Sequence, residues 1–208
     1  MSAQLFADDI LFYQRILHAA GHYDDTIDGV WGAHTEAGDQ AFLAEYEDIR
    51  TALGAFDART EGNIRTLLPQ AQRAVRGFLT TAATGMDGFT IKVLSGTRTY
   101  AEQDRLFSQG RNGNPGIIVT KARGGESNHN FGIAWDVGLF QNGRYLTGTA
   151  PGDEAAYKQL ADVALTPQLE WGGSWTGFVD RPHYQLRIDL TLTQLRKEFE
   201  DGTLRLTG

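Results

Sequence analysis

The chain has 208 residues, of which 41% are hydrophobic and 22% charged, a composition typical of a globular protein. Its net charge of −7, without any block of Lys and Arg, argues against nucleic-acid binding. The lack of cysteine excludes disulfides, thiolate metal sites and a cysteine nucleophile. No apolar stretch is long enough to span a bilayer, so we expect no membrane insertion.

The first nine residues, Met-Ser-Ala-Gln-Leu-Phe-Ala-Asp-Asp, lack the basic region and the long apolar core of a Sec signal peptide. We therefore expect synthesis in the cytoplasm. A target outside the cytoplasm would have to be reached by another route.

The first fifth of the chain has the pattern of two helices joined by a turn-rich segment. A helix is expected over about residues 10–20, with Asp8 and Asp9 at its start and Gly21 at its end. A second helix is expected from Thr35 towards residue 53.

This order resembles the small helical peptidoglycan-binding-like domains, and we place such a domain at residues 1–54. The matching positions are Gly21, Tyr23, Ile27-Asp28-Gly29, Gly32, Thr35, Ala41 and Phe42. Two positions depart from the family pattern, because Asp39 replaces an apolar residue and Leu43 replaces Gln. The resemblance implies wall binding. The departures leave an equal alternative, in which the segment is a structural cap on the next domain.

A second domain, residues 55–208, is expected to begin near the segment 54–59. Pro69 suits the first turn of a helix, and residues 89–95 alternate apolar and polar side chains as a half-buried strand does. Arg98 follows that strand in a Gly-containing turn, where its guanidinium suits a carboxylate or a developing oxyanion. Taken alone, an ordinary surface ion pair explains Arg98 better.

Further elements are expected downstream of Arg98. Residues 100–109 and 153–165 have helical patterns, and residues 178–186 are expected to form the last strand. Asn142-Gly143 is a strong signal for a two-residue hairpin turn. Thr193 is expected to cap a final helix that stops at Gly202.

Two short segments hold the residues best suited to chemistry. The stretch 126–136 contains His129 and Asp136, and the stretch 180–183 adds Asp180 and His183. Two His and one Asp, with a fourth position left to water, are the ligand pattern of a catalytic zinc site. The remaining carboxylate, Asp180, is then free to act as a base.

These residues resemble the M15 zinc peptidases from about Asp57 to the C-terminus. The matching motifs are Ser95-Gly-Thr-Arg98, Ser127-x-His129-x-x-Gly132-x-Ala134-x-Asp136 and Asp180-x-x-His183. Residues 100–103, 109–111 and 170–175 are similar to the branch of phage endolysins and L-alanyl-D-glutamate endopeptidases. The resemblance implies a hedgehog-like α+β fold, with a central antiparallel sheet flanked by helices. This domain would follow the small all-α N-terminal domain in the chain.

The resemblance also implies a role for each site residue. His129, Asp136 and His183 would hold Zn2+, Asp180 would be the general base, and Arg98 would stabilise the oxyanion. Four more residues are assigned to substrate binding or to support of the ligands: Ser127, Gln103, Ser95 and Trp175. A bound zinc makes water a nucleophile at neutral pH.

The implied activity is hydrolysis of the peptidoglycan stem peptide at the L-Ala–D-Glu bond, by a monomer. Asp180 favours this endopeptidase, because the carboxypeptidases and dipeptidases of the superfamily typically have Glu at that position. The alternatives are a D-Ala-D-Ala carboxypeptidase or dipeptidase, a catalytically silent zinc-containing wall-binding module, or, least favoured, a structural protein without metal. A phage lysin, a host wall-remodelling enzyme and a secreted toxin all fit the sequence. In each case the wall would be reached by holin-dependent, lytic or other non-Sec release.

Overall fold

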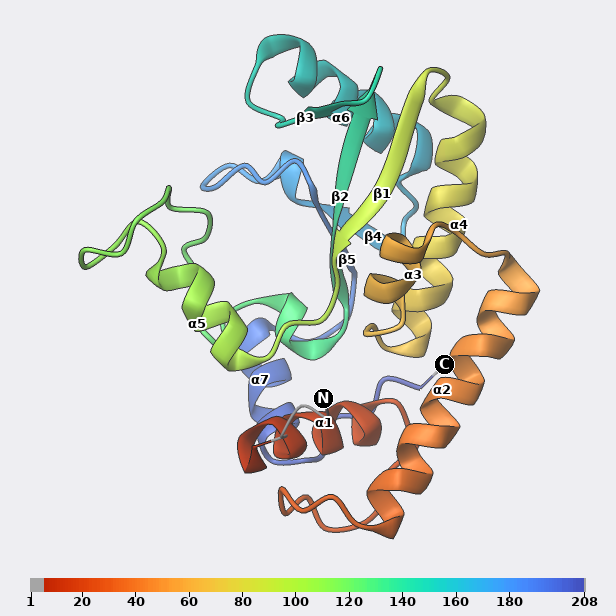
Figure 1. The fold of residues 1–208 in the computed structure, drawn as a ribbon, viewed down its shortest axis with the longest axis vertical. Helices are drawn as coiled ribbons and strands as arrows, with labels where there is room; N and C mark the ends of the chain where they lie inside the picture. Colours follow the sequence, from red (N-terminus) through yellow and green to blue (C-terminus); the bar gives the residue numbers. More distant parts are fainter. Residues whose placement is uncertain (1–5, 208) are drawn as a thin grey trace.

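The computed structural model describes residues 6–207 and forms an α+β structure around one antiparallel sheet (Figure 1). Residues 1–5, part of the stretch inspected for a signal peptide, lie outside the described residues. The helices are α1 Ala7–Ala19, α2 Ala33–Leu53, α3 Ala58–Ile64, α4 Pro69–Gly85, α5 Tyr100–Ser108, α6 Pro151–Ala164 and α7 Leu192–Glu200, with 3-10 turns η1 Asn128–Phe131 and η2 Gly172–Ser174. The strands are β1 Phe89–Ser95, β2 Ala134–Gln141, β3 Arg144–Leu146, β4 Leu169–Trp171 and β5 His183–Leu186.

The sheet has the order β1-β2-β5-β4, with β3 paired to β2 through the predicted Asn142-Gly143 hairpin. Both turn residues have positive φ, 52° and 78°, as a type I′ turn requires. The register places Asp136 opposite His183 on one side and next to Ser95 on the other. A register shift between Val93 and Ser95 lies three residues before Arg98. The pairing of β1, β2 and β5 therefore gathers four of the predicted site residues at one end of the sheet.

Side chains alternate along each strand, so one face of the sheet packs against α4 and the other face carries the site residues. Trp135 and Tyr184 point to the α4 side, where the ring of Phe78 lies 6.5 and 4.5 Å from theirs. Their neighbours Asp136 and His183 therefore point to the opposite face. Figure 1 shows α4 on one side of β1 and β2 and α5 on the other. The apolar layer under α4 holds the strands that carry the site.

The N-terminal helices share a core with the rest of the protein. Ile16 and Leu17 of α1 belong to the same buried cluster as Phe199 of α7 and Leu204. The backbone N–H of Leu206 also donates to the carbonyl of Ala19, at 2.9 Å. The division into domains at residue 54 stays a prediction.

Asp39, which departs from the wall-binding pattern, has a defined partner in the structure. It accepts a hydrogen bond of 2.5 Å from the hydroxyl of Tyr13, whose ring stacks on Trp31. The unusual carboxylate thus fixes an aromatic pair between the first two helices.

The expected elements differ from the structure mainly at their ends. The last strand begins at His183 instead of residue 178, and the final helix is capped by Thr191, two residues before Thr193. The short helix α3, capped by Asp57, and the three-residue strand β4 carry no strong sequence pattern and were not predicted. Within residues 6–207, no helix is both long and apolar enough to cross a membrane.

A buried ion pair joins α2, α3 and α4. The guanidinium of Arg76 donates two hydrogen bonds to the Glu61 carboxylate, at 2.9 and 2.7 Å, and a third to the carbonyl of Gly54. The same carboxylate accepts from the Tyr46 hydroxyl and the Phe56 N–H, both at 2.7 Å. Arg76 is 0% exposed and Glu61 8% exposed.

This ion pair predicts a loss of stability in acid. Burial raises the pKa of Glu61, but hydrogen bonds from Arg76, Tyr46 and Phe56 outweigh it and lower the pKa overall. The contribution of Glu61 is therefore complete above its unfolded pKa, near 4.5, and is lost as the pH falls through the lower folded pKa. We expect the free energy of unfolding of the wild type to fall, from neutral to acid pH, towards that of the Glu61→Gln variant. A constant difference between them would contradict the assignment.

Candidate metal centre and cleft

Three buried or half-buried side chains converge at the end of the sheet. The Nε2 of His129 lies 3.2 Å from Oδ1 of Asp136 and 3.1 Å from Nδ1 of His183, and the latter two atoms are 3.3 Å apart. Zinc bound tetrahedrally at about 2.0–2.1 Å requires ligand atoms about 3.3–3.4 Å apart. The three atoms thus already have nearly the spacing of one face of such a tetrahedron. The group is a candidate metal site of two His and one Asp.

The hydrogen bonds on the far side of each imidazole leave its lone pair facing this centre. The Nδ1 of His129 lies 2.7 Å from the carbonyl oxygen of Gly96, which can only accept, so this nitrogen carries the proton. The Nε2 of His183 lies 2.9 Å from Oε1 of Gln185, and therefore also carries a proton. Two lone pairs and a carboxylate then meet at one point, an arrangement that a cation satisfies.

Local structure holds His129 in place. It lies on the 3-10 turn η1, which ends at Gly132 with φ 71°, and a Cβ at Gly132 would meet Leu68 at 2.9 Å. The side chain of Asn130 donates to the carbonyl of Arg98 and accepts from the N–H of Gly125. The small residue of the motif is thus required by close packing and by the left-handed backbone.

The charge balance of the centre favours an ionised Asp136. Burial raises the pKa of Asp136, but His129, His183 and Arg98 outweigh burial and hold it well below its usual range. Burial lowers the pKa of His129. Burial also lowers that of His183, but its hydrogen bond with Asp136 and the carboxylate charge outweigh burial and raise the pKa overall. A proton in the metal-free centre therefore belongs on His183, and a metal has to displace it.

Arg98 lies beside the centre and contacts Asp136 directly. One guanidinium nitrogen pairs with Oδ2 of Asp136, another donates to Gln103 at 3.2 Å, and Nε donates to the Ser95 hydroxyl at 2.9 Å. A guanidinium has five N–H donors, so the three contacts leave two for a ligand. Two of the predicted site residues, Ser95 and Gln103, thus hold Arg98 in place.

Asp180 lies in the turn that leads into β5. Its backbone N–H donates to Gly172 and its carbonyl accepts from the N–H of His183. Burial, and next the charge of Asp136, raise the pKa of Asp180 to about 6. A carboxylate with a pKa near the working pH is suited to general base catalysis.

Comparisons with known proteins find similarity to an M15 peptidase family and to peptidoglycan endopeptidases. Residues 120–186 match a Peptidase_M15_4 family model, described as D-alanyl-D-alanine carboxypeptidase. Residues 120–186 are therefore similar to the peptidase M15 family. It is similar to peptidoglycan L-alanyl-D-glutamate endopeptidase CwlK of Bacillus subtilis (strain 168), with 36% identity over 110 residues. That match covers 50% of this chain and 65% of CwlK, just under two thirds of the relative's length. A solved structure, the L-Ala D-Glu endopeptidase ChiX of Serratia marcescens, has 26% identity and a TM-score of 0.46, covering 64% of this chain and 89% of ChiX.

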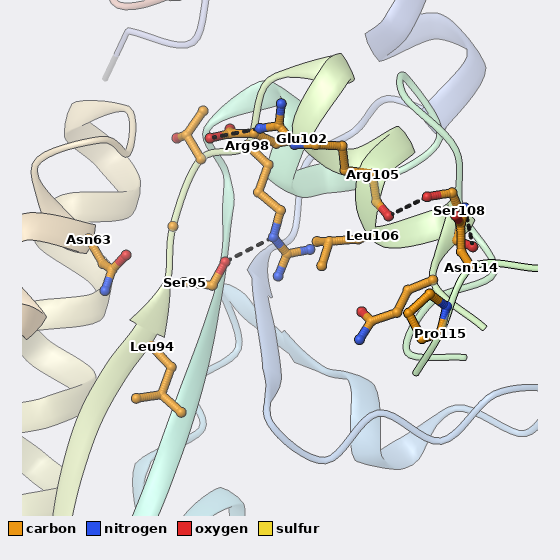
Figure 2. A pocket seen from close by; sticks show the side chains of 13 residues that line it. Asn63, Leu94, Ser95, Arg98, Glu102, Arg105, Leu106, Ser108, Asn114 and Pro115 are labelled. Atoms are coloured by element: carbon orange, nitrogen blue, oxygen red, sulfur yellow. Dashed lines mark hydrogen bonds and ion pairs between the residues drawn. The ribbon is translucent and has the colours of Figure 1, made fainter. Parts of the chain in front are cut away.

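A cleft of about 610 Å³ lies next to Arg98, within the usual range for ligand pockets. Ser95 and Arg98 at the end of β1 form one wall, and Arg105 and Leu106 of α5 form another. Figure 2 shows the guanidinium of Arg98 between Ser95 and Leu106. Arg98 also contacts Asp136, so this residue links the cleft to the candidate metal centre.

Trp175 and Ser127 are the two other predicted site residues. The Trp175 ring is half-buried, with its centroid 5.0 Å from that of His183. Ser127 precedes η1, but its side chain makes no capping hydrogen bond there.

The sequence analysis assigned no role to Glu170 or Gln185, although it matched residues 170–175 to the endopeptidase branch. Gln185 lies two residues after His183 on β5, so both side chains point to the same face. That spacing was the available signal. Glu170 lies opposite Gln185 in the β4–β5 register, which no short-range pattern reveals.

Proposed function

We propose that this chain is a zinc-dependent peptidoglycan endopeptidase that hydrolyses the stem peptide at the L-Ala–D-Glu bond. The convergence of His129, Asp136 and His183 beside Asp180 and Arg98 carries the proposal. The similarity to CwlK, whose name gives this bond, supports the substrate.

Each residue would have a separate task. His129, Asp136 and His183 would hold the zinc, which supplies a Lewis acid and makes water a nucleophile at neutral pH. Asp180 would accept the proton of that water and later pass it to the leaving amine. Arg98, which has two N–H donors without a partner among residues 6–207, would orient the scissile carbonyl and stabilise the negative charge that develops on its oxygen.

Digestion of purified sacculi, with and without a chelator, tests this function. Mass spectrometry should find peptides that begin with D-Glu and glycan that retains L-Ala, and the chelator should abolish both. Zinc added back should restore them. A protein that binds zinc and releases no fragment would overturn the proposal.

A D-Ala-D-Ala carboxypeptidase is the second candidate, since the matched family model carries that description. Asp180 favours the endopeptidase. The same digestion separates the two, because the carboxypeptidase releases D-alanine alone from a pentapeptide.

Gly172 packs against Asp180, so a substitution at Gly172 tests how precisely Asp180 has to be positioned. A Cβ at Gly172 would lie 2.6 Å from the carbonyl oxygen of Asp180 and 3.1 Å from Cβ of His183, so the backbone has to move. Since a misplacement of about 1 Å can cost about 100-fold in rate, we expect Gly172→Ala to lower kcat/KM by about 10–100-fold. Gly177→Ala, in the same loop but with open space around it, is the matched control and should leave the rate unchanged. Equal rates for the two variants would contradict the prediction.

A further inference from the structure

A chain of hydrogen bonds runs from His183 away from the metal centre. The Nε2–H of His183 donates to Oε1 of Gln185 at 2.9 Å, and the Gln185 amide nitrogen donates to Oε2 of Glu170 at 3.0 Å. The indole N–H of Trp175 donates to the other oxygen of Glu170, at 2.6 Å. These hydrogen bonds thus join β5, β4 and the loop after β4.

Glu170 determines the direction of every bond in this chain. As a carboxylate it can only accept, so Gln185 must turn its NH2 group towards Glu170 and its oxygen towards His183. That oxygen also accepts from the side chain of Asn128 at 2.8 Å, which agrees with the same orientation. Facing an acceptor, the Nε2 of His183 must carry the proton, and Nδ1 keeps the lone pair that faces Asp136.

The other imidazole has no such dependence. His129 donates to the backbone carbonyl of Gly96, a group that cannot reverse its polarity. The tautomer of His183, by contrast, depends on a side-chain amide that can accept or donate after a half turn. His183 and Gln185 are 5% and 9% exposed, so water cannot readily replace a lost partner.

Glu170 also fixes an aromatic ring beside the same imidazole. Its second oxygen holds the indole of Trp175, whose ring centroid lies 5.0 Å from that of His183. A single carboxylate therefore controls the proton on His183 and the position of the ring that covers it.

We propose that Glu170 is a positioning residue that fixes the metal-binding tautomer of His183 through Gln185. The inference rests on the metal centre of the proposed function. It states that Glu170 strengthens the binding of zinc at that centre. With Gln at position 170, the Trp175 indole and the Gln185 amide compete for one oxygen. Gln185 is then free to reverse and to leave Nδ1 of His183 protonated.

The test compares zinc dissociation constants, measured by competition with a chelating dye. Loss of a hydrogen-bond partner behind a metal ligand typically weakens binding by about 10–100-fold, so Glu170→Gln should weaken zinc binding by at least about tenfold. Glu170→Gln combined with Gln185→Glu puts the carboxylate next to His183 and an amide behind it, and should recover most of this loss. A role in folding alone would give no recovery.

Glu36→Gln is the matched control. Glu36 also accepts from an indole N–H, that of Trp31 at 2.9 Å, but it lies on α2. Its substitution should leave the zinc dissociation constant unchanged.

Nitrogen-15 NMR of the metal-free wild type tests the tautomer without any variant. At alkaline pH, where both imidazoles are neutral, the proton of His183 should be found on Nε2. A proton on Nδ1, or a Glu170→Gln protein that binds zinc as tightly as wild type, would overturn this inference and leave the proposed function standing. A wild type that binds no zinc would overturn both.

Discussion

Replacing Asp180 with Asn is expected to lower peptide hydrolysis by about 100- to 10,000-fold, the usual contribution of a general base. Asn has nearly the same shape but cannot accept a proton. The three proposed metal ligands, His129, Asp136 and His183, remain intact, so zinc binding should change little. Because burial and Asp136 raise the pKa of Asp180 to about 6, the wild-type carboxylate is largely ionised at neutral pH and ready to act.

Rates on a stem-peptide substrate and zinc content, measured on the same preparation, check this prediction. Asp189→Asn is the control, since Asp189 is exposed a few residues further along the chain. Loss of zinc together with activity would make Asp180 part of the metal centre. Activity within about tenfold of wild type, with zinc bound, would remove Asp180 from the role of base.

The largest effect on stability is expected for Arg76→Met. Removal of one partner from a buried ion pair typically costs about 3–5 kcal/mol, because the other charge stays buried. Among the residues that the structure describes, the carboxylate of Glu61 would then keep Tyr46 and Phe56 as its only donors. For a chain of this size, such a loss corresponds to a fall in Tm of roughly 6–20 °C.

Thermal and urea unfolding of two further variants test whether the loss of stability comes from the unpaired charge of Glu61. Arg73→Met, on the same helix, breaks the exposed pair with Glu45 and should cost at most about 1 kcal/mol. Adding Glu61→Leu to Arg76→Met should recover stability, since an apolar pair replaces an unpaired charge. A double variant less stable than Arg76→Met alone would contradict this account.

Much of the fold follows from local sequence patterns. Period-2 alternation predicted β1, Asn142-Gly143 predicted the β2–β3 hairpin, and Pro69 predicted the first residue of α4. Local patterns did not predict α3 and β4. Helix α3 has seven residues and, besides its Asp57 cap, is held by contacts of Glu61 with Arg76, 15 residues later. Strand β4 has three residues and gains its structure from pairing with β5.

The site was predicted as a set of residues, but not as a network. The spacing of His129, Asp136 and His183 predicted a ligand set, and the structure brings these side chains together. The contact of Arg98 with Asp136 depends on the register of β1 with β2 and its shift after Val93. Register between strands is a tertiary property, so the sequence motif alone could not show which group Arg98 meets.

The packing of α1 on α7 restricts the replacement of the N-terminal helices by other sequences during evolution. The ring of Phe199 on α7 lies 5.5 Å from that of Phe12 on α1 and 5.3 Å from that of Phe131, two residues after His129. Recombination that replaced the first two helices would expose Phe199 and loosen the packing beneath His129, a proposed metal ligand. A lineage that swaps its N-terminal segment therefore has to change α7 at the same time, and the two segments are expected to be inherited together.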